Sequence, residues 1–252
     1  MNPFIAILSP AKSLHTKTQV SALQQPIFLQ KSAEINAELR KKSPSQLMDL
    51  QSISNKLAEL NADRNLHWSV EGHQEATPAM FTFTGDVYQG LDVETLDAES
   101  RERAKESLII LSGLYGILRP YDAILPYRLE MGTKISINDS ADLYAFWKNE
   151  VTNYFNQTYS EKTLINLASN EYASVIDRKN LRLPVLEITF KDFSKGDYKI
   201  ISFHAKKARG LFARFLVEKN PQSLNDLQLF DYGGYSFSSE LSNHSQLVFL
   251  RG

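Results

Sequence analysis

The run Ile5-Ala6-Ile7-Leu8 is followed at once by the polar cluster Ser9-Pro10-Ala11-Lys12, and this abrupt change predicts a buried strand from Phe4 to Ser9 that leads into a turn. The same pattern recurs at three later places. The apolar stretches 108–111, 164–168 and 200–205 stop at the clusters SGLYG, SNEY and KKARG. Ligand sites in sheets with parallel strands lie just beyond the carboxyl ends of the strands. We therefore expect the four clusters to share one site built from backbone amides, hydroxyls and cations.

The composition is that of an ordinary soluble globular protein, with 252 residues of which 42% are hydrophobic and 23% are charged. The sequence contains no run of 18 apolar residues and no secretory signal, so we expect a cytoplasmic protein without a membrane partner. It contains no cysteine, which excludes disulfides, thiolate zinc sites and thiol redox sensing. Because no linker or internal repeat divides the sequence, we expect residues 1–252 to form a single domain.

Charge is distributed unevenly along this chain, whose net charge is −1. Residues 177–219 carry eleven Lys or Arg and five Asp or Glu, a net charge of +6, so the remainder carries −7. A basic segment can bind anions locally even when the whole molecule is nearly neutral. A solvated basic surface without any ligand explains the same pattern equally well.

Periodicity predicts both helices and strands along the chain. Helices are expected at 27–66 with a break at Ser43-Pro44, and at 97–106, 142–159 and 208–219. Strands are expected at 4–9, 108–111, 164–168 and 246–250, together with a hairpin that pairs 186–193 with 198–204. Ser43 is a suitable helix cap, because Pro44 fits the first helical position and Gln46 completes a partial capping box.

The KKARG cluster gives the strongest indication of anion binding. Lys206, Lys207 and Arg209 are expected at the start of helix 208–219, where cations face the positive end of the helix dipole at a cost of a few tenths of a kcal/mol each. A bound anion would relieve this cost, and so would a carboxylate partner such as Glu171. In SPAK, Lys12 can meet a phosphate as a point charge, although an ordinary β-turn is the simpler interpretation.

The SGLYG cluster has two interpretations. Gly113 and Gly116 permit the left-handed backbone that forms an anion-binding nest of amides, and Arg119 and Arg128 follow nearby. A tight structural crossover needs the same glycines. The cluster is neither a Walker A loop nor a dinucleotide fingerprint, and the chain has no Gly-x-Ser-x-Gly elbow.

Candidate catalytic groups are Ser9, Tyr115, Glu171 and Lys206, because a hydroxyl, a phenol, an acid and an amine at strand ends exceed what phosphate binding requires. No reaction is assigned to them. Metal binding is not predicted: none of the five histidines forms a close ligand pair, although His67 and His73 are six positions apart. We also predict no cofactor.

The segment 50–58, LQSISNKLA, resembles the hairpin of a helix-hairpin-helix module, whose usual form is LPGIGxKxA. Ser52 and Ser54 stand at the glycine positions, and Gln51 stands at the proline position. Such a hairpin offers backbone amides to a DNA phosphate at the start of a helix. A plain pair of core helices is the alternative interpretation.

Taken together, several segments resemble the YaaA family of peroxide-stress proteins, and they occur in order along essentially the whole chain. The matching segments are LSPAK, FTGDVYQGLD, LSGLYGILRPYDAILPYRLEMG, LYAFWKNEVTNYFNQ, INLASNEY and IISFHAKKARGLFARF. The resemblance implies a mixed α/β fold of its own type with a basic cleft and a helix-hairpin-helix element at about 44–66. It also implies duplex-DNA binding and the limitation of intracellular free iron during hydrogen peroxide stress.

The first functional hypothesis is therefore a cytoplasmic DNA-binding protein with weak sequence preference, since phosphate contacts give affinity without base readout. Its expected DNA or anion contacts are Lys12, Ser52, Ser54, Lys56, Arg119, Arg128, Lys206, Lys207, Arg209 and Arg214. The alternative is an enzyme acting on a small phosphorylated or carboxylated substrate such as a nucleotide. A third hypothesis, an iron-binding protein, requires His or carboxylate ligands that cluster in space. An open groove as wide as a duplex favours DNA, whereas a closed pocket favours an enzyme.

Overall fold

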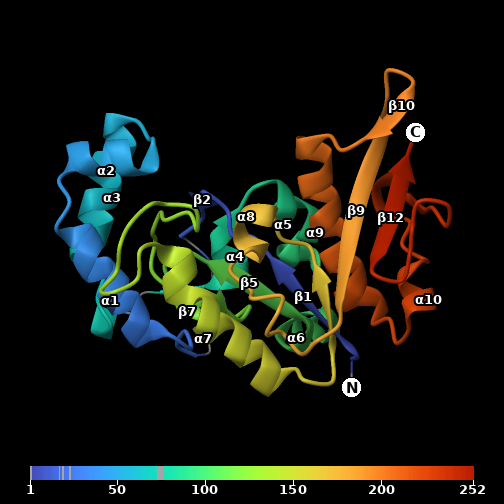
Figure 1. The fold of residues 1–252 in the computed structure, drawn as a ribbon, viewed down its shortest axis with the longest axis horizontal. Coiled ribbons are helices and arrows are strands. Elements are labelled where there is room, and N and C mark those ends of the chain that lie inside the picture. Colours follow the sequence, from blue (N-terminus) through green and yellow to red (C-terminus); the bar gives the residue numbers. More distant parts are fainter. Residues whose placement is uncertain (1, 17, 19, 23, 73–75) are drawn as a thin grey trace.

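The centre of the molecule is a sheet of parallel strands, which this computed structural model describes together with the rest of residues 2–16, 18, 20–22, 24–72 and 76–252 (Figure 1). The parallel strands are β1 (Phe4–Leu8), β5 (Leu108–Ser112), β8 (Thr163–Asn166), β9 (Val185–Ser194) and β12 (Gln246–Arg251). β1 pairs with β5 on one side and with β8 on the other, and all five of its residues are buried. The apolar run that opens the sequence is therefore the middle of the core.

The order of the parallel strands across the sheet is β5-β1-β8-β9-β12. Numbered by their order along the chain, they are arranged 2-1-3-4-5, which is one of the common orders of doubly wound sheets. In such a sheet the connections leave in opposite directions from the first strand and its neighbour. A crevice therefore forms beyond the carboxyl ends of β1 and β8.

Short antiparallel strands complete the sheet and make it mixed. β6 (Gly116–Leu118) pairs with β5, β10 (Asp197–Lys199) pairs with β9, and β11 (Ser236–Phe237) pairs with β12. Two small ribbons lie apart from the sheet: β2 (Ser13–Leu14) with β4 (Phe83–Thr84), and β3 (Thr77–Pro78) with β7 (Ala123–Ile124). The predicted mixed α/β fold is confirmed.

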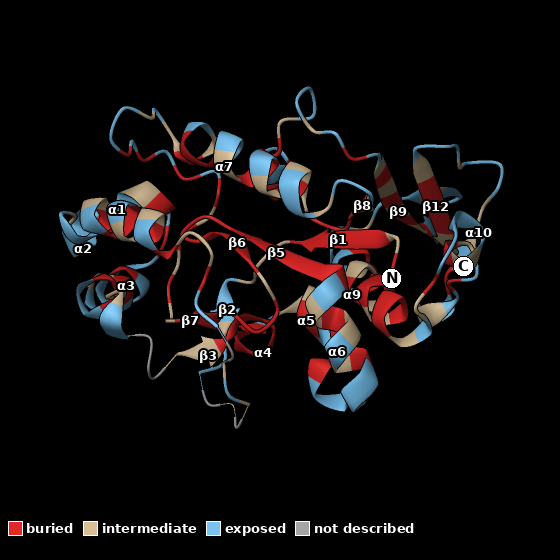
Figure 2. Cartoon of the chain, turned by 90° about the horizontal axis from the view of Figure 1, so that it is seen from below, coloured by how far each residue is buried: buried red, intermediate tan, exposed pale blue. Residues whose placement is uncertain are grey.

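Helices cover both faces of the sheet. α7 (Leu143–Thr158) lies on one face, and α5 (Asp86–Leu91), α6 (Ala98–Ser107) and α9 (Ser202–Lys219) lie on the other (Figure 2). The start of α7 follows from its sequence, because the Asp142 carboxylate accepts a hydrogen bond from the Ala145 amide at 2.8 Å. Its apolar positions recur at helical spacing, and Trp147 and Phe155 on that face are fully buried.

Three further helices project from the end of the molecule opposite β12 (Figure 1). They are α1 (Leu29–Arg40), α2 (Pro44–Gln51) and α3 (Asn55–His67). The predicted break at Ser43-Pro44 is confirmed, with a complete capping box in which Ser43 and Gln46 bond each other's backbone amides. The short helices elsewhere are α4 (Ala79–Thr82), α8 (Asn170–Ala173), α10 (Leu224–Leu227) and the 3-10 helices η2 (Val93–Thr95) and η3 (Tyr232–Gly234).

The segment 200–205 is the main error of the sequence-based secondary structure. It was expected to be a strand, but β10 ends at Lys199 and α9 already begins at Ser202. The reason is visible in burial: Ile200 and Phe203 are exposed, while Ala205, Ala208 and Phe212 are buried at helical spacing. Lys206 therefore lies one turn inside the helix, and the predicted cost of cations at the helix start does not apply to it.

Candidate functional site

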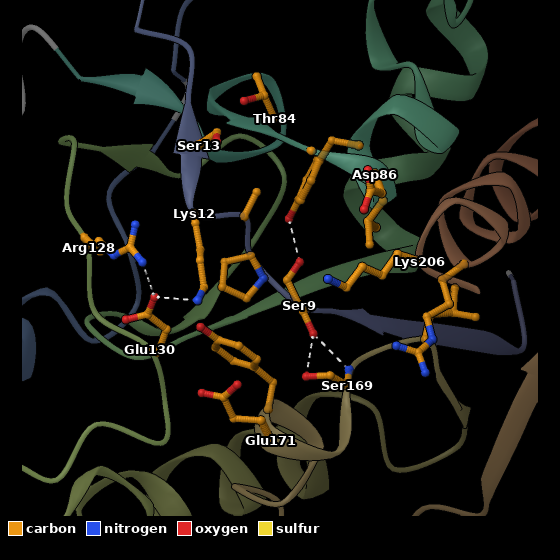
Figure 3. Close-up of a pocket in the computed structure, with 18 of the residues that line it drawn as sticks. Ser9, Lys12, Ser13, Thr84, Asp86, Arg128, Glu130, Ser169, Glu171 and Lys206 are labelled. Atoms are coloured by element: carbon orange, nitrogen blue, oxygen red, sulfur yellow. Dashed lines mark hydrogen bonds and ion pairs between the residues drawn. The ribbon is translucent and has the colours of Figure 1, made fainter. Parts of the chain in front are cut away.

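A pocket of about 450 Å³ lies beyond the carboxyl ends of β1 and β8, in the crevice that the strand order creates. We call it the strand-end pocket. Three of the four predicted clusters meet there, and Figure 3 shows them converging from different elements. From these clusters the lining includes Ser9, Pro10, Ala11, Lys12, Ser169, Glu171, Tyr172, Lys206 and Arg209.

Ser9 is held at the centre of the pocket by contacts from both sides. Its Oγ accepts a hydrogen bond from the Ser169 amide at 2.9 Å and donates to the Ser169 Oγ at 3.3 Å. Its carbonyl accepts from the Tyr88 hydroxyl at 3.0 Å. Residues far apart in sequence thus fix the β1 and β8 strand ends relative to each other. These bonds occupy the Ser9 hydroxyl as both donor and acceptor.

Three charged side chains form a linked group along one wall. The Glu130 Oε1 lies 3.1 Å from Arg128 Nη2 and 3.3 Å from Lys12 Nζ. Lys12 is mostly exposed, whereas Arg128 and Glu130 are largely covered. One carboxylate therefore balances two cations, and this wall keeps a net charge of +1. The backbone of Arg128 is in turn held by Gln51, which donates to its carbonyl at 3.0 Å.

Helix α9 contributes two cations to the opposite side of the pocket. Lys206 and Arg209 have no hydrogen bond or ion pair with any residue that the structure describes, and Arg209 is half-buried. Burial lowers the pKa of the Arg209 guanidinium, and the Glu187 carboxylate only partly offsets this. A partly desolvated cation whose charge is only partly balanced is unfavourable. An anion in the pocket would remove this cost.

Two glycines bring α9 close enough to α5 to form this wall. A Cβ on Gly210 would lie 1.8 Å from the Val87 carbonyl oxygen, and a Cβ on Gly90 would lie 2.2 Å from the Lys207 carbonyl oxygen. Only glycine permits such a backbone approach. The contact places the start of α5, with the pocket residues Asp86 and Val87, next to α9.

Carboxylates line the pocket as well as cations. Glu171 Oε1 accepts a hydrogen bond from the Gly132 amide at 3.0 Å, and the Glu171 carbonyl accepts from the Tyr144 hydroxyl at 2.9 Å. Asp86 opens α5 on the side of Lys206 (Figure 3). The described lining thus carries four cations, Lys12, Arg128, Lys206 and Arg209, against three carboxylates, Asp86, Glu130 and Glu171.

Three tyrosines supply the flat part of the lining. Tyr88, Tyr127 and Tyr172 are each less than a tenth exposed, and burial raises the pKa of all three phenols. They are therefore neutral at pH 7 and can donate hydrogen bonds. Leu129 and Leu167 also border the pocket and are buried.

The SGLYG cluster does not line the strand-end pocket. All five residues of 112–116 are buried, and the hydroxyl of Tyr115 accepts hydrogen bonds from Trp68 Nε1 at 2.9 Å and from the Leu125 amide at 3.2 Å. A Cβ on Gly113 would lie 2.4 Å from the Leu129 carbonyl oxygen. The glycine thus lets this loop pack behind the wall that holds Arg128 and Glu130, as the structural interpretation predicts.

Four of the predicted cations lie elsewhere. Arg119 pairs with the buried Asp122 at 2.9 Å, and Arg214 pairs with Glu218 at 2.7 Å. Lys207 is exposed on α9 outside the pocket lining, and Lys56 is exposed on α3. None of these four side chains lines the pocket with Lys206 and Arg209.

The turn between α2 and α3 contains the two predicted serines. Ser52 ends α2 in the left-handed region, with φ of 50°, and Ser54 Oγ caps α3 by accepting from the Leu57 amide at 3.4 Å. Ile53 between them is buried. Ser52 therefore has the positive φ that glycine adopts most readily.

No group of three His, Asp or Glu side chains is placed to hold a metal ion within the described part of the chain. His67 lies beside Asp63 at 3.2 Å, and His204 lies beside Asp192 at 3.4 Å. His73 lies outside the described residues. Within the same ranges, no helix combines the length and apolar character that crossing a membrane requires.

Sequence reasoning gave no role to one strand end that does line the pocket. β4 ends at Thr84, and Gly85, Asp86 and Tyr88 follow it into the lining. Gly85 has a φ of 133°, which favours glycine. A short apolar run before a Gly-Asp pair is the same kind of signal as the other clusters, but β4 has only two residues and is hard to recognise in a sequence.

Comparison with known proteins places the chain in a family. A sequence model described as peroxide stress protein YaaA matches residues 4–241. The chain is 46% identical over 253 residues to a UPF0246 protein of Idiomarina loihiensis, with 98% of both chains covered. It is 44% identical over 249 residues to a UPF0246 protein of Flavobacterium johnsoniae, which covers 97% of this chain and 99% of that protein. The chain therefore belongs to the YaaA family of peroxide stress proteins.

Proposed function

We propose that this protein contributes to the peroxide-stress response by binding a small anionic molecule in the strand-end pocket. The observation that carries the proposal is Arg209, a half-buried guanidinium in the pocket that forms no ion pair within 4 Å among the described residues and whose burial the Glu187 carboxylate offsets only in part. Arginine presents a fork of donors that matches a carboxylate or a phosphate. Lys206 lies one helical turn before it and adds a second positive charge.

The size and the charge of the pocket favour a small molecule over a duplex. Its volume of about 450 Å³ falls within the range of roughly 300 to 1,000 Å³ that is typical of small-molecule sites. A duplex backbone presents uniform negative charge and is bound by a uniformly basic surface. The pocket instead combines four cations with three carboxylates. This combination suits a ligand that carries both an anionic group and hydrogen-bond donors.

The proposal is tested by anion binding to wild type and to two variants with the same change in charge. Inorganic phosphate should raise the melting temperature of the wild type, since a ligand that binds only the folded state stabilises it. Arg209→Ala should weaken phosphate binding about tenfold or more, as expected for losing charge-assisted hydrogen bonds. Lys207→Ala, two positions before Arg209 on the same helix but outside the pocket, should bind like wild type. Equal losses in both variants would contradict the proposal.

The strand-end pocket could also catalyse a reaction of the anionic molecule that it binds, and the protein would then be an enzyme. Ser9, Glu171 and Lys206 are the predicted catalytic candidates that line the pocket, whereas Tyr115 is buried behind it. Incubating the protein with phosphate esters and following phosphate release tests for turnover. An active wild type and an inactive Glu171→Gln would assign the reaction to this site.

Duplex-DNA binding through the α2–α3 turn is the second candidate function. The specific observation in its favour is Ser52, whose positive φ is the one that glycine supplies at the matching position of the helix-hairpin-helix pattern. The first backbone amides of α3 have no partner within the helix, and Lys56 lies exposed beside them. A phosphate at this position would meet amides and a cation together.

Salt titration of duplex binding distinguishes the turn from the pocket. If the turn holds a phosphate, Lys56→Glu should weaken binding and reduce the slope of log affinity against log salt by about one. If the pocket and α9 hold the duplex, the triple variant K206A/K207A/R209A should weaken binding instead. The slope of log affinity against log salt should then fall by about three. Unchanged binding in both variants would exclude both surfaces.

The proposed limitation of free iron is tested in cells that lack this protein. We expect wild type and Lys207→Ala to lower the intracellular free iron measured by electron paramagnetic resonance during peroxide exposure. Arg209→Ala should fail to do so if the pocket ligand carries the response. If Arg209→Ala lowers free iron as fully as the wild type at equal protein levels, anion binding in the pocket is not needed for the effect on iron.

A further inference from the structure

The strand-end pocket is asymmetric in charge along its length. Lys206 approaches Ser9 from one side, whereas Glu130 and Glu171 lie on the other side of Ser9 (Figure 3). Glu130 is already paired with Lys12 and Arg128, so it is neutralised within the protein. Glu171 has no cation within ion-pair distance among the described residues. Counted with Asp86, the end formed by Lys206 and Arg209 keeps a net charge of +1, and the other end offers the Glu171 carboxylate, which has no ion pair, beside the Lys12–Glu130–Arg128 group.

Glu171 is positioned to accept hydrogen bonds from a ligand. The Gly132 amide holds one of its oxygens, Oε1, at 3.0 Å, and a carboxylate has about four acceptor sites in total. A Cβ on Gly132 would lie 3.2 Å from the same oxygen, so the glycine lets the carboxylate sit close to the backbone. The side chain is thus fixed in place while Oε2 has no hydrogen-bond partner among the described residues. N–H groups of a ligand are its natural partners.

Aromatic side chains contribute to the pocket lining. Tyr127 and Tyr172 line the pocket with less than a tenth of each residue exposed, and Leu129 and Leu167 are buried. Aromatic side chains pack favourably against other aromatic rings. In addition, the crevice between the first strand and its neighbour in a 2-1-3-4-5 sheet is where such folds bind mononucleotide cofactors, which is an argument by analogy of fold.

We propose that the ligand of the strand-end pocket is a nucleoside monophosphate. Its phosphate lies against Arg209 and Lys206, its base lies beside Tyr127 and Tyr172, and N–H groups of the base donate to Glu171. This assignment rests on the proposed function, because it names the anionic molecule that the pocket binds. Guanine fits it best among the common bases, since two adjacent N–H groups on its Watson–Crick edge can bond one carboxylate side by side.

Calorimetric titration of the purified full chain tests the assignment with five probes: inorganic phosphate, ribose 5-phosphate, guanosine, guanosine monophosphate and adenosine monophosphate. Guanosine monophosphate should bind at least tenfold more tightly than ribose 5-phosphate and than guanosine, because both ends then contribute. Glu171→Gln should remove that advantage and leave ribose 5-phosphate binding unchanged. Arg209→Lys, which keeps the charge but loses the guanidinium fork, should weaken every phosphate-bearing probe about equally. Lys207→Ala is the matched control and should change nothing.

The outcomes separate this assignment from the proposed function. If phosphate and ribose 5-phosphate bind through Arg209 but the nucleotides bind no more tightly, and Glu171→Gln has no effect, the nucleotide assignment is wrong and anion binding stands. If no probe binds the wild type, both are wrong. If adenosine monophosphate binds tenfold more tightly than guanosine monophosphate, the pairing of guanine with Glu171 is wrong. Circular dichroism melts confirm that each variant is folded.

Discussion

Asp122 is a fully buried carboxylate in the turn after β6, and its titration affects the stability of the fold. It accepts hydrogen bonds from the backbone amide and from Nε of Arg119, both at 2.9 Å. Burial nevertheless raises the pKa of Asp122 from 3.8 to about 6, since desolvation outweighs the Arg119 contacts. The folded state therefore holds this proton more tightly than the unfolded state. The resulting stabilisation is complete below pH 3.8 and is lost as the pH rises through about 6.

Asp122→Asn should flatten the dependence of stability on pH. The difference between the two pKa values corresponds to roughly 3 kcal/mol, so the wild type should lose up to about that much more unfolding free energy than the variant between pH 4 and pH 7. Urea unfolding of both proteins at pH 4, 5, 6 and 7 measures this. Other carboxylates titrate in both proteins and cancel in the comparison. Parallel profiles would show that the Arg119 contacts dominate and that Asp122 is ionised throughout.

At the scale of elements, the contact between α5 and α9 depends on Gly90 and Gly210. A Cβ at either position would overlap backbone atoms of the other helix, at 2.2 Å and 1.8 Å. Backbone atoms cannot avoid a clash by changing rotamer, as a side chain can. Gly210→Ala or Gly90→Ala should therefore force the helices apart and lower the unfolding free energy by on the order of 3 kcal/mol. The double variant should cost less than the sum, since one displacement makes room for both methyl groups.

Denaturant unfolding of the two single variants and the double variant measures the coupling free energy between Gly90 and Gly210. A gain of stability, as replacing glycine by alanine gives in an open helix, would contradict the close packing. The same variants should weaken phosphate binding in the strand-end pocket, because the two helices carry Asp86 and Arg209 on adjoining walls. Additive costs with unaltered binding would show that the helices adjust independently.

Elements with strong local signals could be predicted from the sequence. β1 follows from an uninterrupted apolar run, and α6 and α7 follow from Asp97 and Asp142, whose carboxylates cap the helices that begin after them. The strand prediction for 200–205 was wrong because Ile200, Ile201 and Phe203 favour a strand, and only the burial of Ala205 with Ala208 reveals the helical face. Local preference was overridden there by packing against the sheet.

The candidate site could be predicted in part for a similar reason. Ser9, Ser169 and Glu171 follow neighbouring strands β1 and β8, so their convergence follows once the strands are recognised. Tyr115 also follows a strand, but the loop after β5 turns back as β6 and is buried. The direction in which a loop leaves a sheet is set by tertiary contacts such as that of Gly113 with Leu129, which no local pattern encodes.

At the scale of the whole molecule, the α2–α3 pair and the sheet differ in how they are held. All five residues of β1 are apolar and buried, whereas the buried residues of α3 are Ala58, Asn61 and Asn65. Burial of one methyl group and two amides contributes little hydrophobic free energy. The pair projects from the end of the molecule (Figure 1), and Gln51 supplies a hydrogen bond to the body through the Arg128 carbonyl.

Hydrogen exchange should therefore show two levels of stability. Amides in α2 and α3 should exchange through local opening at least tenfold faster than those in β1, β5 and β8, which open only on global unfolding. Gln51→Ala should speed exchange in α2 and α3 further and leave β1 unaffected, because it removes a link between the pair and the pocket wall. Exchange of α3 at the rate of β1 would contradict this separation.

Hydrogen exchange also identifies which surface each ligand uses. A nucleotide in the pocket should protect residues around β1 and β8, whereas a duplex on the Ser52–Ser54 turn should protect α3.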